Sequence, residues 1–273
     1  MGFQSDVLTI ERDGHVATLW LDNPEARNAM GPAFWHDLPL AMAELGDDES
    51  VRAVVLAARG KHFTAGLDLS MFAGPLGGEG ETSEVGKRRG FLAMVKRLQA
   101  SITSVAECAK PVVAAVHGAC IGGGIDLITA CDVRLCAANS VFSVRETRMA
   151  MVADVGTLQR LPKVISAGHA AELVYTGKDI DAERARAIGL VNDVLADQEA
   201  VVAAAQAMAC EIAANSPLAV QGSKAILQRG ESMTVEQGLD LVALWNAAFI
   251  HSEDLGEAVA AFFEKRTPEF HGR

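Results

Sequence analysis

The sequence predicts an α/β protein in which a parallel sheet with helical connections is followed by a helical C-terminal third. The apolar runs at residues 51–58 and 112–116 are typical of strands that are covered on both faces. Helical patterns alternate with these runs, which indicates right-handed β-α-β connections within one sheet. After Asp154 the pattern is almost wholly helical. Helices are expected there at residues 197–215, 217–228, 234–249 and 254–265.

A β-hairpin and a helix are expected before the first buried strand. The turn signal Asp13-Gly14 separates the apolar residues 7–10 from residues 15–21, which alternate with period two. Residues 32–45 have the apolar spacing of a helix.

Glycine-rich segments interrupt the middle of the chain. Residues 74–90, GPLGGEGETSEVGKRRG, predict a mobile surface loop before a helix at residues 91–108. After the second buried strand, a glycine-rich turn at residues 118–124 leads into the apolar residues 125–130. Residues 133–137 predict one more strand.

Length and composition limit the organisation and the partners of the chain. Its 273 residues, 50% of them hydrophobic and 22% charged, suffice for one large core and a helical appendage. We expect an α/β core at residues 1–196 and a helical oligomerisation region at residues 197–273, whose apolar faces lack enough remaining chain to cover them. The net charge of −11 repels phosphate backbones, so no nucleic acid partner is expected.

The N-terminal residues and the cysteines predict a cytoplasmic protein. The first residues lack the basic and apolar regions of a secretory signal, and no apolar run is long enough to span a membrane. The five cysteines form an odd number without a CxxC pair and lie mostly in apolar runs. We interpret them as reduced core thiols, and no metal site is expected.

The common nucleotide and hydrolase motifs are missing from the sequence. The triple glycine Gly122-Gly123-Gly124 follows a strand, but Leu127 occupies the last glycine position of a GxGxxG fingerprint counted from Gly122. A P-loop is excluded because Val55 stands where its first glycine would precede Gly60-Lys61. Neither GxSxG nor HExxH occurs, so serine-esterase and zinc-protease chemistry have no local signature.

A strand that leads through glycines into a helix can still bind negative charge. The N–H groups at a helix start lie at the positive end of the helix dipole, and missing Cβ atoms let a substrate approach the backbone. This arrangement describes an oxyanion hole, although close packing of helix and strand would also require glycines. A second candidate is FTAGLDL at residues 63–69, which could equally be a turn with Asp68 as a helix cap.

Four segments occur in the order found in one known family. They are NPEARNAM at residues 23–30, AGLDL at 65–69, HGACIGGG at 117–124 and QRLP at 159–162. With them, nearly the whole chain resembles the crotonase (enoyl-CoA hydratase/isomerase) superfamily. The resemblance implies a crotonase-like fold of repeated ββα units with a helical C-terminal trimerisation region, and trimers that commonly pair into hexamers.

The resemblance also implies an acyl-CoA substrate and the residues that hold it. In that family two backbone N–H groups bind the thioester oxygen, and by position these belong to Leu67 and Gly123. Coenzyme A is part of the substrate, so no separate cofactor is implied. The residues that the resemblance places at the CoA are Ala26, Arg27, Ala65, Gly66, Asp68 and Leu69, together with Phe262 and Lys265, which would meet the CoA of a neighbouring subunit.

Three carboxylates near the glycines bear on the reaction. Asp126 follows the triple glycine in an apolar helix, where a buried acid needs hydrogen bonds or the helix N-terminus, and a purely structural acid is the alternative. Glu146 could be a solvated charge beside two arginines in SVRETR. Asp154 precedes VGTLQRL and would also make an ordinary helix N-cap.

These acids and residues 153–165, ADVGTLQRLPKVI, resemble the Δ3,5-Δ2,4-dienoyl-CoA isomerases of the family. The family's hydratases have glutamates at positions 126 and 146 and glycine at position 154. The resemblance assigns proton removal from C2 to Glu146 and proton delivery at C6 to Asp154, with Asp126 buried nearby to stabilise the proton-transfer network. Such a division suits a dienolate whose charge extends from the thioester oxygen to C6, because one carboxylate cannot easily serve both carbons.

Two other functions stay open at this point. An enoyl-CoA hydratase, or a Δ3-Δ2-enoyl-CoA isomerase, could have secondary dienoyl activity. A CoA-binding assembly protein could have kept the fold and lost the chemistry.

The spacing of the acids adds a structural expectation. One straight helix would separate Glu146 from Asp154 by about 12 Å along its axis, too far to act on C2 and C6 of one chain. We therefore expect a turn or short helix after Glu146 and a new helix that starts at Asp154. Met149, Met151 and Val152 could line an acyl pocket, although methionine more often fills a core.

Overall fold

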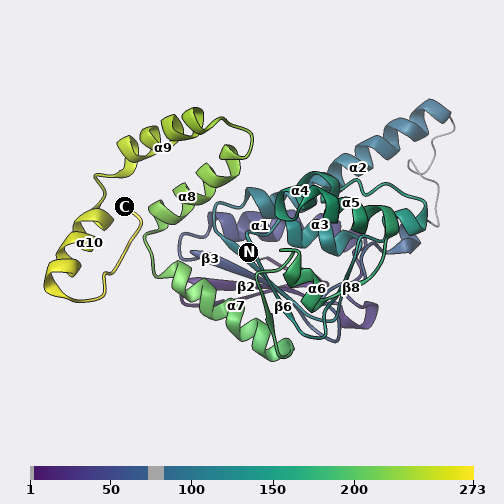
Figure 1. Ribbon diagram of the computed structural model, residues 1–273, viewed down its shortest axis with the longest axis horizontal. Helices are drawn as coiled ribbons and strands as arrows, with labels where there is room; N and C mark the ends of the chain where they lie inside the picture. Colours follow the sequence, from purple (N-terminus) through teal and green to yellow (C-terminus); the bar gives the residue numbers. More distant parts are fainter. Residues whose placement is uncertain (1–2, 73–82) are drawn as a thin grey trace.

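A computed structural model describes residues 3–72 and 83–273 (Figure 1). At its centre lies a six-stranded sheet in the order β1-β2-β3-β4-β6-β9, in which β1 pairs antiparallel with β2 and every other pair is parallel. Its strands are β1 (Leu8–Asp13), β2 (Val16–Leu21), β3 (Ala53–Ala58), β4 (Val112–Val116), β6 (Val133–Ala137) and β9 (Asp193–Leu195). The predicted α/β class, with its hairpin and buried parallel strands, is confirmed.

Helices cover both faces of this sheet (Figure 1). All six residues of β3 are buried, and because side chains alternate along a strand they enter two separate cores. Val55 packs with Ala205 and Ala209 of α7 (Gln198–Ala213) on one face. Leu56 belongs to the larger core on the other face, beneath α1 (Pro32–Asp47) and α3 (Gly123–Thr129). The small residues of α7 let that helix lie close to the sheet.

A second, smaller sheet supports the glycine-rich turn. It contains β5 (Ala119–Ile121), β7 (Val141–Ser143) and β8 (Ile180–Asp181), in that order. The sequence patterns missed these three strands and β9, because strands of two or three residues are too short to show period-two alternation. The remaining helices are η1 (Pro24–Ala26), η2 (Leu69–Phe72), α2 (Glu84–Glu107), η3 (Glu146–Met149), α4 (Thr157–Val164), α5 (Ala167–Thr176), α6 (Ala182–Ala187), α8 (Pro217–Gly230), α9 (Val235–Phe249) and α10 (Glu253–Glu264).

The helix predicted at residues 91–108 begins two turns earlier than expected. The Ser83 side chain accepts the N–H of Gly86 and caps α2, which starts at Glu84. The prediction of a loop is therefore wrong for residues 84–90, because glycines inside a long capped helix cost only about 1 kcal/mol each. Residues 74–82 of that predicted loop lie outside the residues that the structure describes.

The C-terminal helices α8, α9 and α10 extend away from the sheet (Figure 1). Lys224 of α8 is buried and donates to the Asp132 carboxylate at 2.7 Å and to the Lys110 carbonyl at 2.9 Å, so α8 is attached beside the starts of β4 and β6. Asp254 of α10 accepts the N–H groups of His271 and Gly272, which returns the end of the chain to α10. The division into a core at 1–196 and an oligomerisation region at 197–273 stays a prediction.

The cysteines and the helix lengths bear on two sequence expectations. All five cysteines are free thiols; Cys108, Cys120, Cys131 and Cys136 are buried, whereas Cys210 is exposed and is not a core residue. Among residues 3–72 and 83–273, no helix has the length and apolar character needed to cross a membrane.

Candidate active site

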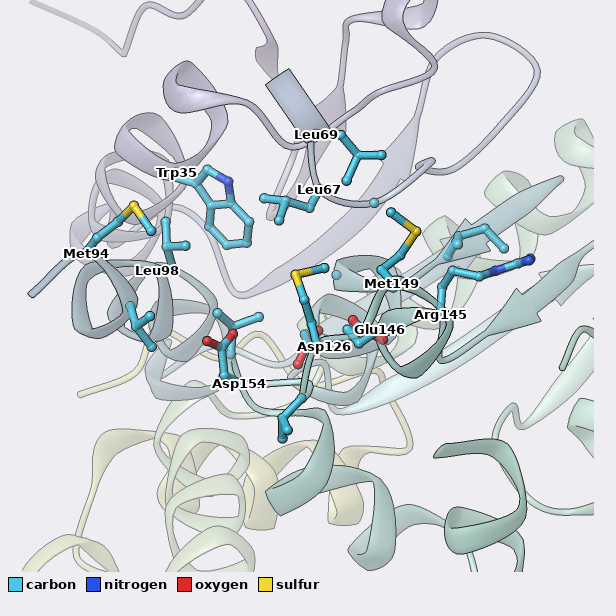
Figure 2. A pocket seen from close by; sticks show the side chains of 18 of the residues that line it. Trp35, Leu67, Leu69, Met94, Leu98, Asp126, Arg145, Glu146, Met149 and Asp154 are labelled. Atoms are coloured by element: carbon cyan, nitrogen blue, oxygen red, sulfur yellow. The ribbon is translucent and has the colours of Figure 1, made fainter. Parts of the chain in front are cut away.

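A cavity of about 740 Å³ opens between the glycine-rich segments and α2. This volume lies in the range of small-molecule sites. Figure 2 shows its side chains, with acids on one wall and apolar groups facing them. The lining residues are Trp35, Ala65, Gly66, Leu67, Leu69, Phe91, Met94, Val95, Leu98, Ile121, Gly122, Gly123, Asp126, Arg145, Glu146, Met149, Met151, Val152, Asp154 and Val155.

Two backbone segments meet at the cavity and bring Leu67 close to Gly123. A parallel bridge pairs Thr64 with Cys120 in β5. Gly66 has φ +86°, and a Cβ there would lie 2.5 Å from the Ile121 carbonyl oxygen, so only glycine permits this approach. Within the described residues, the N–H groups of Leu67 and Gly123 donate to no carbonyl. Both residues line the cavity, where such N–H groups could bind an oxyanion.

Asp126 lies at the bottom of the cavity and is completely buried. Its Oδ1 accepts the backbone N–H of Thr157 at 2.5 Å, and its Oδ2 has no hydrogen-bond partner in the described chain. Burial raises the pKa of Asp126 to about 7, with a further contribution from the charge of Glu146. The structural interpretation of this acid is therefore correct in part, since it holds the start of α4, but the same group also faces the cavity.

Glu146 begins η3 and turns its carboxyl group toward the glycine-rich segment. A Cβ on Gly122, which has φ +54°, would lie 3.3 Å from Glu146 Oε1. Arg145 donates to Asp179, and Arg148 donates to the Thr176 carbonyl, so neither arginine neutralises this glutamate. Oε2 is buried without a partner among the described residues. Burial, and then the charge of Asp154, raise the pKa of Glu146.

Asp154 lines the cavity but does not cap a helix. The helix predicted to start at Asp154 is α4, which starts at Thr157 with Gly156 before it, and its N-terminus takes the Asp126 carboxylate instead. The N-cap interpretation of Asp154 is therefore wrong, and its side chain faces the cavity (Figure 2). Partial burial raises the pKa of Asp154.

The chain folds back between Glu146 and Asp154, as the spacing predicted. The short helix η3 ends at Met149 and is followed by Ala150 in the left-handed conformation, with φ +56°. The three acids consequently line one cavity. Met149, Met151 and Val152 also line it, as expected, on the turn that connects the acids.

The residues assigned to CoA divide into two groups. Ala65, Gly66 and Leu69 line the cavity, whereas Ala26, Arg27, Asp68, Phe262 and Lys265 are outside its lining. Ala26 and Arg27 are exposed beside it, because the Arg27 carbonyl accepts the N–H of Ala65 at 3.0 Å. The Asp68 carboxylate accepts the N–H of Ser70 at the start of η2, the local capping role weighed above.

Phe262 and Lys265 lie at the end of α10 and do not line the cavity; Figure 1 shows α10 far from α2, which contributes to the lining. The Phe262 side chain is 77% exposed, which leaves it available to another surface.

The sequence pattern did not predict that α2 supplies an apolar wall of the cavity. Phe91, Met94, Val95 and Leu98 line the cavity from one face of α2, and Trp35 of α1 completes the wall (Figure 2). Their i, i+3, i+4, i+7 spacing was the available signal. It indicates an apolar helix face but does not distinguish a cavity wall from a core.

The comparisons identify the family. Residues 11–273 match the family model described as enoyl-CoA hydratase/isomerase. The chain therefore belongs to the enoyl-CoA hydratase/isomerase family. The crystal structure of enoyl-CoA hydratase from Bacillus anthracis is similar over 98% of this chain and 100% of that one, with a TM-score of 0.89 and 30% identity. The crotonase-like fold expected from the sequence is confirmed.

Within this family the chain is similar to proteins named for one reaction. It is 44% identical to a mitochondrial Δ3,5-Δ2,4-dienoyl-CoA isomerase of Dictyostelium discoideum, over 93% of this chain and 87% of the relative. It is 40% identical to a peroxisomal protein of the same name in Arabidopsis thaliana, over 97% and 96%. The resemblance to dienoyl-CoA isomerases is confirmed, as is the expectation of an enzyme.

The same names correct the expected location. These relatives are labelled mitochondrial or peroxisomal, which contradicts the prediction of a cytoplasmic protein. Free thiols and the composition of the first residues do not distinguish these compartments from the cytoplasm.

Proposed function

We propose that this chain converts 3,5-dienoyl-CoA to 2,4-dienoyl-CoA in the oxidation of unsaturated fatty acids. The observation that carries the proposal is one cavity that combines the carboxyl groups of Asp126, Glu146 and Asp154 with the N–H groups of Leu67 and Gly123. The names of the relatives support the same reaction.

The proposed reaction moves one proton off the substrate and another onto it. Glu146 takes the proton from C2, and the electrons of that bond extend into a dienolate with negative charge on the thioester oxygen. Asp154 then gives a proton to C6 while the carbonyl re-forms, so the double bonds move from C3 and C5 to C2 and C4. Glu146 ends protonated and Asp154 ionised, and a proton must pass between them, or through solvent, before the next cycle.

Backbone N–H groups stabilise the dienolate in this mechanism. Leu67 and Gly123 would donate to the thioester oxygen as its charge develops, and donors of this kind contribute about 3–4 kcal/mol each to lowering a barrier. Gly123 begins α3, so the positive end of that helix dipole adds to the effect. The oxygen is thereby placed next to Gly122, which Glu146 faces.

The electrostatics suit an acid and a base in one site. Burial raises the pKa of all three carboxyl groups, which favours protonation of some of them when the site is closed. Asp126, with a pKa of about 7, would hold a proton near neutral pH and spare the site a second negative charge beside the dienolate.

CoA binding and assembly belong to the same proposal. The exposed backbone around Ala26 and Arg27 and the segment from Ala65 to Leu69 would hold the CoA, which is part of the substrate, so no separate cofactor is needed. Trimers, or dimers of trimers, would cover the apolar side chains exposed on α8–α10. These include Leu227, Leu239, Leu244, Ile250, Phe262 and Phe263. Phe262 and Lys265 would then meet the CoA of a neighbouring subunit.

The test uses 3,5-dienoyl-CoA and follows the 2,4-diene by ultraviolet absorbance. The wild-type protein should form the product, whereas Asp154→Asn should not, although it should still exchange the C2 proton with deuterated solvent. Asp193→Asn, the same change at an exposed site on β9, is the matched control and should remain active. Product formation at the wild-type rate by Asp154→Asn would exclude the role given to Asp154.

Hydration is the second candidate, since the B. anthracis neighbour is named an enoyl-CoA hydratase. The wild-type protein should turn over 3,5-dienoyl-CoA much faster than it hydrates crotonyl-CoA. The reverse order would favour the hydratase, and binding of acyl-CoA without any turnover would favour a non-catalytic protein.

A further inference from the structure

The segment that carries Asp154 has little backbone support of its own. Residues 152–156 form neither helix nor strand, and none of their N–H groups donates to a backbone carbonyl within the described chain. Side chains from outside hold it instead. The Gln99 carboxamide on α2 donates through Nε2 to the Asp154 carbonyl oxygen at 2.6 Å.

A second connection joins the same two elements. Arg160 of α4 donates to the Val155 carbonyl at 3.4 Å and to the Thr103 hydroxyl at 2.9 Å. Gln99 and Thr103 are four residues apart, so they lie on the same face of α2. Helix α2 therefore holds the Asp154 segment at two neighbouring points, one of which is the backbone of Asp154 itself.

We infer that Gln99 is a positioning residue, whose hydrogen bond to the Asp154 carbonyl fixes the distance between the Asp154 carboxyl group and C6 of the substrate. This inference rests on the proposed function. The carbonyl and the side chain share one Cα, so movement of the backbone displaces the carboxyl group directly. Misplacement of a catalytic group by about 1 Å can reduce a rate by up to about a hundredfold. Glu146 is held separately, on η3, and its contact with C2 does not depend on Gln99.

This geometry predicts an effect on one proton transfer and not on the other. Loss of the Gln99 bond should slow proton delivery at C6, while the base still removes the C2 proton. The dienolate would then return to substrate more often and acquire solvent hydrogen at C2. A general loosening of the fold would slow both steps together.

The test measures both steps in deuterated water. Gln99→Met keeps the length of the side chain and removes the donor. We expect formation of 2,4-dienoyl-CoA to fall about tenfold, with an increase of similar size in the deuterium found at C2 of unreacted substrate per turnover. Gln99→Glu places an acceptor against the same carbonyl. It should have the same two effects as Gln99→Met, and it serves if the methionine variant does not fold.

The matched control is Gln228→Met. Gln228 of α8 also donates to a backbone carbonyl of α2, that of Ala106, at 2.8 Å, but about two turns further along the helix than Gln99. It should leave the ratio of exchange to isomerisation unchanged. If the Gln99 variants also leave this ratio unchanged in an active protein, the positioning role is overturned. A wild-type protein that does not isomerise 3,5-dienoyl-CoA would overturn the proposed function, and the inference with it.

Discussion

The carboxylate of Asp126 accepts the backbone N–H of Thr157, 31 positions further along the chain, at the first residue of α4. Gly156 precedes that residue and has no side chain to cap the helix, so a buried acid from α3 takes this part. One side chain thus joins the helix that begins with Gly123 to the helix that follows Asp154. The candidate catalytic groups are held relative to one another by an acid that is itself in the cavity.

Asparagine at position 126 should flatten the pH dependence of stability. The raised pKa of Asp126 means that the folded chain binds this proton more tightly than the unfolded chain does. The resulting stability is complete below about pH 4 and is lost as the pH rises through about 7. Between pH 5 and pH 8 the wild-type protein should therefore lose roughly 3 kcal/mol more than Asp126→Asn, measured by urea denaturation at each pH.

The asparagine variant keeps an oxygen that can accept the Thr157 N–H. Asp126→Leu removes that acceptor as well, and should be about 1–2 kcal/mol less stable than Asp126→Asn, which retains it. An equal loss of stability with pH in the wild type and in Asp126→Asn would contradict the assignment of this proton to Asp126.

The rate should depend on pH through two carboxyl groups. The proposed mechanism requires Glu146 ionised and Asp154 protonated, and burial raises the pKa of both. The acidic limb of kcat/KM should therefore lie above the ordinary glutamate value of 4.5. Because the charge of Asp154 contributes to the pKa of Glu146, the acidic limb of C2 proton exchange should move to lower pH in Asp154→Asn. A limb that stays in place would show that the two groups do not interact.

The substitution Gly66→Ala should disrupt the site. The added Cβ would lie 2.5 Å from the Ile121 carbonyl oxygen, on a backbone with φ +86°. We expect a loss of stability of about 1–3 kcal/mol or more, with little residual turnover, because the segment that carries Leu67 must move. Gly46→Ala is the matched control: it adds the same methyl group near the end of α1, with no atom within 4 Å, and should stabilise by about 0.5–1 kcal/mol. Thermal denaturation and the rate of diene formation distinguish the two variants.

The substitution Lys224→Met should release α8 from the core. Lys224 is buried and its Nζ lies 2.7 Å from the Asp132 carboxylate, so its loss leaves that carboxylate without its cation. Breaking a fully buried ion pair costs about 3–5 kcal/mol, and because the Asp132 side chain is 25% exposed we expect a smaller loss of about 1–3 kcal/mol. If α8–α10 mediate assembly, the variant should also dissociate at higher protein concentration than the wild type, which analytical ultracentrifugation can measure. Lys163→Met, which removes an exposed ion pair with Glu231 of the same region, should have little effect.

The sequence predicted the main sheet and most long helices, because buried runs such as residues 53–58 and apolar helix faces leave a periodic signal. The short strand β5 left none, and its bridge to Thr64 positions Leu67. The early start of α2 depends on a serine cap within a segment whose glycines suggested a loop. Local composition can favour a loop even where the following helix supplies the stability.

The sequence predicted which residues form the candidate site. It did not predict which of them are in contact or which hydrogen bonds hold them. The acids were identified by resemblance and by the chemistry of a dienolate, and the need for a turn between Glu146 and Asp154 followed from helix geometry. The sequence pattern indicates Asp154 as a possible N-cap of a helix that starts there, whereas α4 starts at Thr157 and its first N–H is accepted by Asp126. Contacts between residues far apart in sequence, including that of Gln99 with Asp154, leave no local pattern.

The cavity takes its walls from residues as far apart as Trp35 and Val155. A nascent chain that has emerged only to the end of β4 would hold four strands of the main sheet, yet it would have neither Gly123 nor any of the three acids. The side chains of Met94 and Leu98, which line the cavity from α2, would meanwhile lack the facing residues from 121 to 155. Recovery of diene formation during refolding should therefore lag behind the recovery of helical circular dichroism, and the interval between them is when aggregation is most to be expected.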